Sequence, residues 1–175
     1  MLRLDSVIPA TTCAAICQQL AQARFEDGAV SGGSADRSIK HDLQLSPRDP
    51  LNQNISRQLS EALRRSDLFR RAAWPRRMTQ PRVSRYDRGM YYREHLDNAF
   101  MGGDATPLRT DIALTVALND ASDYEGGDLV VATDAGEQRW RGKSGDVVVY
   151  SAGCLHAVDE ITAGTRLVAV AWLES

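Results

Sequence analysis

From Arg82 to the end of the chain, short runs of β-branched and aromatic residues alternate with turns that contain glycine. Turn segments such as Glu125-Gly126-Gly127 and Ser151-Ala152-Gly153 separate these runs. Many short strands with a turn between each pair predict a β-sandwich or barrel. The predicted strands are Val83–Tyr86, Asp111–Leu118, Asp128–Ala132, Asp146–Tyr150 and Leu167–Trp172.

The N-terminal part of the chain has a helical pattern. A first helix is predicted from Pro9 to about Arg24, because this segment is rich in alanine, glutamine and leucine. Thr11 or Thr12 could cap its start. The following residues, 27–36, are polar and rich in glycine and serine, so they predict a loop.

A second helix is predicted over Leu51–Phe69, since Pro75 ends anything helical before it. Helices that come first and strands that follow predict a mainly β, α+β fold with the helices laid on one face of the β-core. The apolar residues that recur near helical spacing in this segment are Leu51, Ile55, Leu59, Leu63 and Phe69.

Length and composition restrict the class of protein. The 175 residues suit one domain, 1–175, with helical support over about 1–80 and a β-core over about 81–175. A net charge of -2 gives no general attraction to nucleic acid or anionic membranes, and no apolar run approaches the ~20 residues of a spanning helix. Three cysteines form no disulfide framework and the N-terminus lacks a signal-peptide pattern, so we expect a cytoplasmic protein.

One basic cluster departs from this even charge. Six arginines fall within residues 64–77, where they could bind nucleic acid or an acidic partner. Such a run is more often the solvated face of a helix, and few aromatic residues interleave with it. We therefore do not expect a nucleic-acid partner.

The segment Tyr86–Asp97 carries the chemistry that the sequence suggests. His95 and Asp97 are two residues apart, so in an extended strand both side chains point to one face and can reach one ion. A second histidine would complete a two-histidine, one-carboxylate site of the kind that holds non-haem iron and leaves positions open. His156 is the best candidate, because His41 lies in the polar region before the second helix.

Arg166 follows ten residues after His156 and lies between apolar residues. A hairpin through Thr162-Ala163-Gly164 would return it alongside the His156 strand, with its guanidinium pointing into the interior. A buried arginine needs a partner. Nearby acidic side chains could supply one as a structural ion pair, but a bound dicarboxylate would do so bidentately.

These residues resemble a known family. The stretch Tyr86-x-x-Gly89-x-x-Tyr92-x-x-His95-x-Asp97, followed by His156 and Arg166, is similar to the pattern of prolyl-hydroxylase-type Fe(II)/2-oxoglutarate dioxygenases, and most of all to bacterial PKHD-type hydroxylases. The resemblance runs from about residue 80 to the end, and more faintly over the helices. It implies a double-stranded β-helix, or jelly roll, with helices packed on one sheet.

The resemblance also implies a site. Iron(II) would be held by His95, Asp97 and His156, and 2-oxoglutarate would chelate it and pair its far carboxylate with Arg166, with Tyr86 as a hydrogen-bonding partner. Reaction with O2 would release succinate and CO2 and hydroxylate the substrate, with ascorbate as a possible reductant.

The sequence departs from the family pattern in two ways. PKHD-type relatives continue into a helical C-terminal region, whereas this sequence stops at Ser175, which puts any contact made by that region in doubt. The position two residues after the arginine often carries a hydroxyl group but is Val168 here. The strand at 112–118 also lacks the tyrosine of animal prolyl hydroxylases, although Thr115 could substitute for it as a donor to 2-oxoglutarate.

Three further residues are candidates for the substrate pocket. Tyr92 and Asn98 flank the metal-binding pattern, and Arg109 could either contact substrate or end a strand. The expected function is hydroxylation of a peptide or protein side chain, with proline as one candidate. The alternatives are a small-molecule hydroxylase of the same class and a non-catalytic jelly-roll metal-binding or sensor module. The sequence does not fix the oligomeric state.

Overall fold

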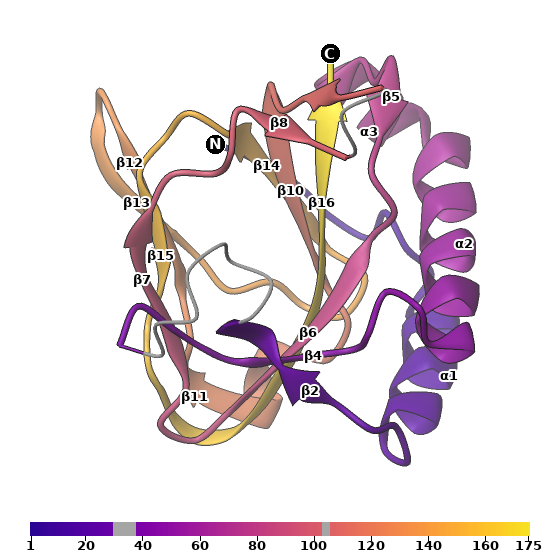
Figure 1. Cartoon of the computed structure of the whole chain (residues 1–175), viewed down its shortest axis with the longest axis vertical. Coiled ribbons are helices and arrows are strands. Elements are labelled where there is room, and N and C mark those ends of the chain that lie inside the picture. The colour runs from indigo at the N-terminus through magenta and orange to yellow at the C-terminus, as the bar shows by residue number, and fades with distance from the viewer. Residues whose placement is uncertain (30–37, 103–105) are drawn as a thin grey trace.

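The computed structural model describes residues 1–29, 38–102 and 106–175, and arranges them in three layers. Figure 1 shows two long helices against one sheet, with a second sheet on the far side of the first. The sequence prediction of a mainly β, α+β fold with helices on one sheet is confirmed. Within the described residues, no helix is long and apolar enough to span a membrane.

The helices differ from their predicted bounds. Helix α1 is Ala10–Leu20, shorter than predicted, and its start has no side-chain cap, so the expected threonine cap is wrong. The second predicted helix is two helices, α2 (Pro50–Arg65) and α3 (Asp67–Ala73). Ser66 between them is extended, and its hydroxyl accepts a hydrogen bond from the Phe69 N–H, which caps α3 and breaks the run.

The larger sheet is antiparallel and lies under the helices (Figure 1). Its middle strand β16 is long and hydrogen-bonds to β10 on one side and β6 on the other. The nine strands formed by described residues run in the order β1 (Leu2–Leu4), β14 (Val147–Ser151), β10 (Ile112–Ala117), β16 (Ile161–Glu174), β6 (Arg82–Asp87), β4 (Leu43–Gln44) and β2 (Glu26–Asp27), with β11 (Tyr124–Gly126) and β5 (Arg77–Met78) also paired to β16.

The smaller sheet has five strands among the described residues and faces the larger one. A separate pair, β8 (Phe100–Met101) with β9 (Leu108–Arg109), and the short 3-10 helix η2 (Ala121–Asp123) complete the described elements. The order of the smaller sheet is β13 (Gly136–Trp140), β12 (Leu129–Thr133), β15 (His156–Val158), β7 (Tyr91–His95) and β3 (Lys40–His41).

Side chains alternate along the strands and build two cores. On β10, Leu114 and Val116 point to the helices, whereas Ala113 and Thr115 point between the sheets. This is the two-residue period of a strand buried on both faces. The helix side therefore holds a mainly apolar core, and the space between the sheets is available for a polar site.

The structure differs from the sequence prediction in the position of Arg166 and in the start of the loop expected over 27–36. The expected hairpin between the His156 strand and Arg166 is wrong, because β15 pairs with β12 and β7 while β16 belongs to the other sheet. Arg166 is opposite Tyr86 on β6 instead. Of the loop expected over 27–36, Asp27 is in β2, and residues 30–36 lie outside the described residues.

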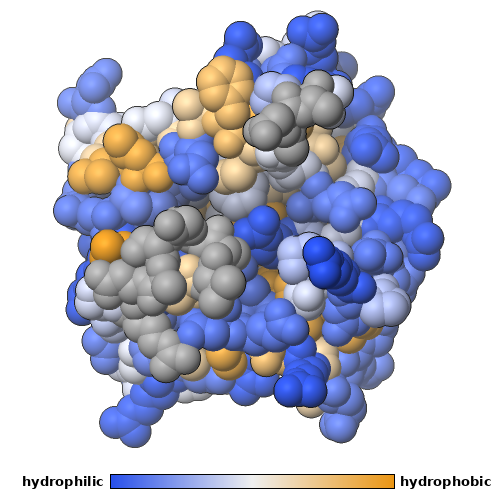
Figure 2. All heavy atoms as spheres, viewed as in Figure 1, coloured by the Kyte–Doolittle hydropathy of each residue, from blue (hydrophilic) through white to orange (hydrophobic). Residues whose placement is uncertain are grey.

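The face shown in Figure 2 is mainly hydrophilic, with hydrophobic residues in separate small groups. Scattered surface hydrophobic residues of this kind are normal on a folded protein. Among the described residues, this face shows no broad apolar patch.

Candidate metal and cosubstrate site

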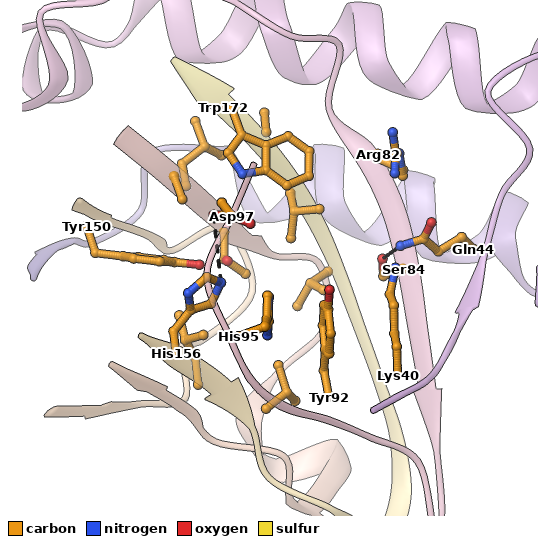
Figure 3. Close-up of a pocket in the computed structure, with 18 of the residues that line it drawn as sticks. Lys40, Gln44, Arg82, Ser84, Tyr92, His95, Asp97, Tyr150, His156 and Trp172 are labelled. Atoms are coloured by element: carbon orange, nitrogen blue, oxygen red, sulfur yellow. Dashed lines mark hydrogen bonds and ion pairs between the residues drawn. The ribbon is translucent and has the colours of Figure 1, made fainter. Parts of the chain in front are cut away.

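His95, Asp97 and His156 come together between the sheets. One ligand atom from each lies within 4.8 Å of the others. The pairing of β7 with β15 places His95 opposite His156, and Asp97 follows two residues after the last residue of β7 (Figure 3). Residues from two distant parts of the sequence are thus brought together by the ladder of the smaller sheet.

Backbone carbonyl groups orient both imidazoles. Nδ1 of His95 lies 2.8 Å from the carbonyl oxygen of Arg93, and Nδ1 of His156 lies 3.0 Å from that of Cys154. A neutral imidazole that donates from Nδ1 leaves its Nε2 lone pair free for a metal. Burial, together with the nearby His156, lowers the pKa of His95 to about 4, so its ring is neutral at neutral pH.

Asp97 supplies the negative charge of the cluster. Among the described residues its Oδ2 atom is buried without a hydrogen-bond partner, and it lies 3.7 Å from Nε2 of His156. Burial raises the pKa of Asp97, and His156 opposes this shift. A buried, unpartnered carboxylate oxygen beside two imidazole nitrogens is a donor set that fits a divalent metal ion.

Arg166 is the largest fully buried side chain among the described residues, with 2% of its surface exposed. Its guanidinium lies 5.2 Å from the centre of the Tyr86 ring, and Tyr124 is hydrogen-bonded to it. No described carboxylate forms an ion pair with the Arg166 guanidinium. The structural ion pair that the sequence left open as an alternative is therefore not found among the described residues. A buried guanidinium that faces the pocket without an acidic partner can donate two parallel hydrogen bonds to the oxygens of a carboxylate.

Thr115 and Tyr150 border the same pocket next to Arg166. Thr115 is buried and hydrogen-bonded to Tyr150, whose pKa is raised by burial. The Tyr150 ring meets His156 edge-on, with 5.1 Å between ring centres. Sequence reasoning placed Tyr150 in a strand but did not identify it as a site residue, because alternation cannot show which sheet faces which.

The three substrate-pocket candidates have different outcomes. Tyr92 stacks on His95 with ring centres 3.5 Å apart, and both Tyr92 and Asn98 line the pocket. Arg109 is exposed, pairs with Asp111 at 2.7 Å and does not line the pocket. Its geometry favours the alternative role at the end of a strand.

Several residues that line the pocket were not predicted from the sequence. They come from β3, β4, β6, β14 and β16, and Figure 3 shows four of them across Tyr92 from the metal-binding cluster. Two of those strands, β3 and β4, have only two residues each, so no periodicity marks them. The missed residues with polar or aromatic side chains are Lys40, Gln44, Arg82, Ser84, Tyr150 and Trp172.

Comparison with known families agrees with this geometry. The family model described as the 2OG-Fe(II) oxygenase superfamily matches residues 81–174. A PKHD-type hydroxylase of Xylella fastidiosa (strain M12) is 35% identical over 181 residues, covering 100% of this chain and 79% of the relative. A PKHD-type hydroxylase of Acaryochloris marina is 36% identical over 175 residues, covering 100% and 78%.

Solved structures show the same fold. A prolyl-4-hydroxylase of Pseudomonas putida has a TM-score of 0.70 at 18% identity, covering 99% of this chain and 92% of its own. A prolyl hydroxylase of Trichoplax adhaerens, solved with a hypoxia inducible factor peptide fragment, has a TM-score of 0.70 at 15% identity, covering 98% and 82%. The chain therefore belongs to the 2OG-Fe(II) oxygenase superfamily, and it is an enzyme of that class that is similar over its whole length to PKHD-type hydroxylases.

Proposed function

We propose that this protein is an iron(II)- and 2-oxoglutarate-dependent hydroxylase whose iron is held by His95, Asp97 and His156. The observation that carries the proposal is the presence, in one pocket, of this cluster and of a buried arginine without an acidic partner among the described residues. A module that only bound metal would not need the arginine, so the pair favours turnover over a sensor role.

The residues of the chain have separable roles in this proposal. The metal, when bound, supplies the activation of O2 that couples oxidation of 2-oxoglutarate to hydroxylation of the substrate. Arg166 holds the far carboxylate of 2-oxoglutarate, and Tyr86 and Thr115 line the same part of the pocket. The three protein side chains leave the remaining metal positions open, and the apolar walls limit the entry of water.

For the substrate, we propose a peptide or protein side chain, with proline as one candidate. The support is that relatives are named hydroxylases and that two proteins of the same fold are named prolyl hydroxylases. Ascorbate as the reductant that keeps iron in the ferrous state, and a cytoplasmic location, stay predictions.

The test is succinate formation. Anaerobic protein is loaded with Fe(II), then supplied with O2 and 2-oxoglutarate, and succinate is read by NMR. We expect iron-dependent succinate, and we expect His95→Ala to reduce it to background because one of three ligands is lost. The matched control is His41→Ala, since His41 lies on β3 and packs edge-on against Tyr91 outside the cluster.

The outcomes separate the candidate functions. Succinate from the parent and His41→Ala proteins but not from His95→Ala supports the hydroxylase, and a peptide library can then be screened by mass for the gain of one oxygen atom. A protein that binds Fe(II) but neither binds nor consumes 2-oxoglutarate would be a metal-binding module, and the proposal would fail.

A further inference from the structure

The pocket has a second polar region that neither the metal cluster nor the cosubstrate accounts for. It is formed by Lys40, Gln44, Arg82 and Ser84, which Figure 3 shows across Tyr92 from His95, Asp97 and His156. Two of these four side chains carry positive charge. We call these four residues the cationic wall.

Strand register separates the cationic wall from the cosubstrate anchor. Arg82, Ser84 and Tyr86 alternate on the pocket face of β6, and the pairing with β16 puts Tyr86 opposite Arg166 but Arg82 opposite Val170. Four residues of strand span about 13 Å at ~3.3 Å per residue. A five-carbon diacid held between Arg166 and the metal cluster would therefore leave Arg82 free for another group.

Two members of the cationic wall, Lys40 and Gln44, pair with Asp42 behind it, whereas Arg82 has no such pair among the described residues. The Lys40 ammonium lies 3.8 Å from the buried Asp42 carboxylate, and Gln44 donates a hydrogen bond to the same carboxylate. The negative charge of Asp27 lies close enough to favour the protonated form of both Lys40 and Asp42. No described residue hydrogen-bonds or forms an ion pair with the Arg82 guanidinium, which lies 5.9 Å from the centre of the Trp172 ring.

Arg82 is also within reach of a ligand. Arg82, Met101 and Trp172 are all partly exposed and line the pocket, whereas Tyr86 and Arg166 at its other end are buried. Burial lowers the pKa of Arg82 and Asp42 opposes this shift, so the guanidinium is partly desolvated but stays charged. A partly dry guanidinium beside an aromatic face pairs strongly with a planar oxyanion.

We infer that Arg82 is a specificity-determining residue that binds a carboxylate of the substrate, at the solvent-facing end of the pocket. This inference rests on the proposed hydroxylase function and adds the substrate class. A singly charged carboxylate suits the site better than a phosphate dianion, because the Asp42 carboxylate lies nearby and would repel the second charge. The carboxylate can belong to a free small acid or to an acidic side chain of a peptide.

The experiment titrates probes into 15N-labelled protein loaded with Zn(II) and one equivalent of 2-oxoglutarate. The readout is the indole N–H signal of Trp172, assigned with Trp172→Phe, while Trp74 and Trp140 serve as internal references for folding. The probes share a prolyl core: N-acetyl-L-proline as a small acid, the C-terminal α-amide of N-acetyl-prolyl-aspartate as a peptide with a free acidic side chain, and N-acetyl-L-prolinamide as the neutral control.

We expect at least one acidic probe to shift the Trp172 signal with an affinity about 10- to 100-fold above that of the neutral amide, as for hydrogen bonds to charged groups. Arg82→Gln should remove this preference. The matched control is Arg85→Gln, because Arg85 lies on the same strand but points away from the pocket and pairs with Asp87 at 2.9 Å. The acidic probe that binds more tightly identifies the source of the carboxylate.

Other results would overturn the inference. These are equal affinity for acid and amide, absence of any Trp172 shift at millimolar probe, or a preference that survives in Arg82→Gln. A loss of 2-oxoglutarate affinity in Arg82→Gln as large as that caused by Arg166→Ala would place Arg82 in the cosubstrate anchor instead. If the parent protein fails to bind 2-oxoglutarate at all, the proposed function itself fails.

Discussion

At the scale of single residues, the site depends on buried polar atoms whose partners within the described chain are missing or incomplete. Asp97 has an unpartnered carboxylate oxygen and Arg166 has no acidic partner. Burying such groups destabilises a fold unless a ligand compensates them. Their placement in one pocket is therefore best explained by binding of a cation and of an anion.

This view gives a prediction for Arg166. Arg166→Ala should weaken 2-oxoglutarate binding by about 10- to 100-fold, because hydrogen bonds to a charged group are lost. Arg166→Lys should recover part of the affinity, since a lysine restores charge but not the bidentate fork. Isothermal titration of the metal-loaded protein measures both, and an alanine variant that binds as tightly as the parent would show that the anchor is elsewhere.

At the scale of elements, the turn between β11 and β12 packs closely against the stem of Arg166. Gly127 has a φ of +66°, and a Cβ atom there would lie 2.2 Å from Cδ1 of Ile161 and 3.1 Å from Cδ of Arg166. Ile161 is fully buried and cannot easily move away. The glycine therefore lets the chain approach β16 closely enough to pack against the arginine stem.

The prediction uses a matched pair of glycines. Gly127→Ala should lower the free energy of unfolding by more than Gly136→Ala, because Gly136 also has a positive φ but nothing lies within 4 Å of its Cβ position. Strain alone costs roughly 1 kcal/mol, and the clash with a packed side chain adds to it. Urea unfolding gives the difference, and 2-oxoglutarate binding should weaken only in Gly127→Ala. Equal losses in the two variants would contradict this account.

At the scale of the whole molecule, the two faces of the larger sheet pack against different partners. One face packs on α1 and α2 in an apolar core, and the other faces the smaller sheet and lines the pocket. Metal binding to His95, Asp97 and His156, which the smaller sheet presents to this pocket, should stabilise the whole fold. A ligand that binds only the native state lowers its free energy.

The measurement is the melting temperature under anaerobic conditions. With Fe(II) at about 100 times its dissociation constant, the gain is about 2.7 kcal/mol, which raises Tm by several degrees in a protein of this size. Asp97→Asn should abolish the rise, while its metal-free form should be at least as stable as the parent because a buried charge is removed. A parent protein whose Tm does not respond to Fe(II) would contradict the metal site.

The sequence alone determined the β-rich core and the main chemistry of the site. Alternation of apolar residues and glycine turns predicts β6, β10, β12, β14 and β16, because strand period and turn chemistry are local properties. The spacing of His95 and Asp97 and the presence of His156 and Arg166 likewise identify the chemical groups. The break at Ser66 was missed, since a helical stripe of apolar residues continues across it.

Only the tertiary structure decided which residues meet. It put β15 and β16 in different sheets, excluded Arg109 from the pocket lining and brought in Arg82, Tyr150 and Trp172. Those contacts depend on strand pairing between segments far apart in the chain, and a two-residue strand such as β3 has no pattern of its own. The pocket is set by how the two sheets face each other, which local periodicity does not encode.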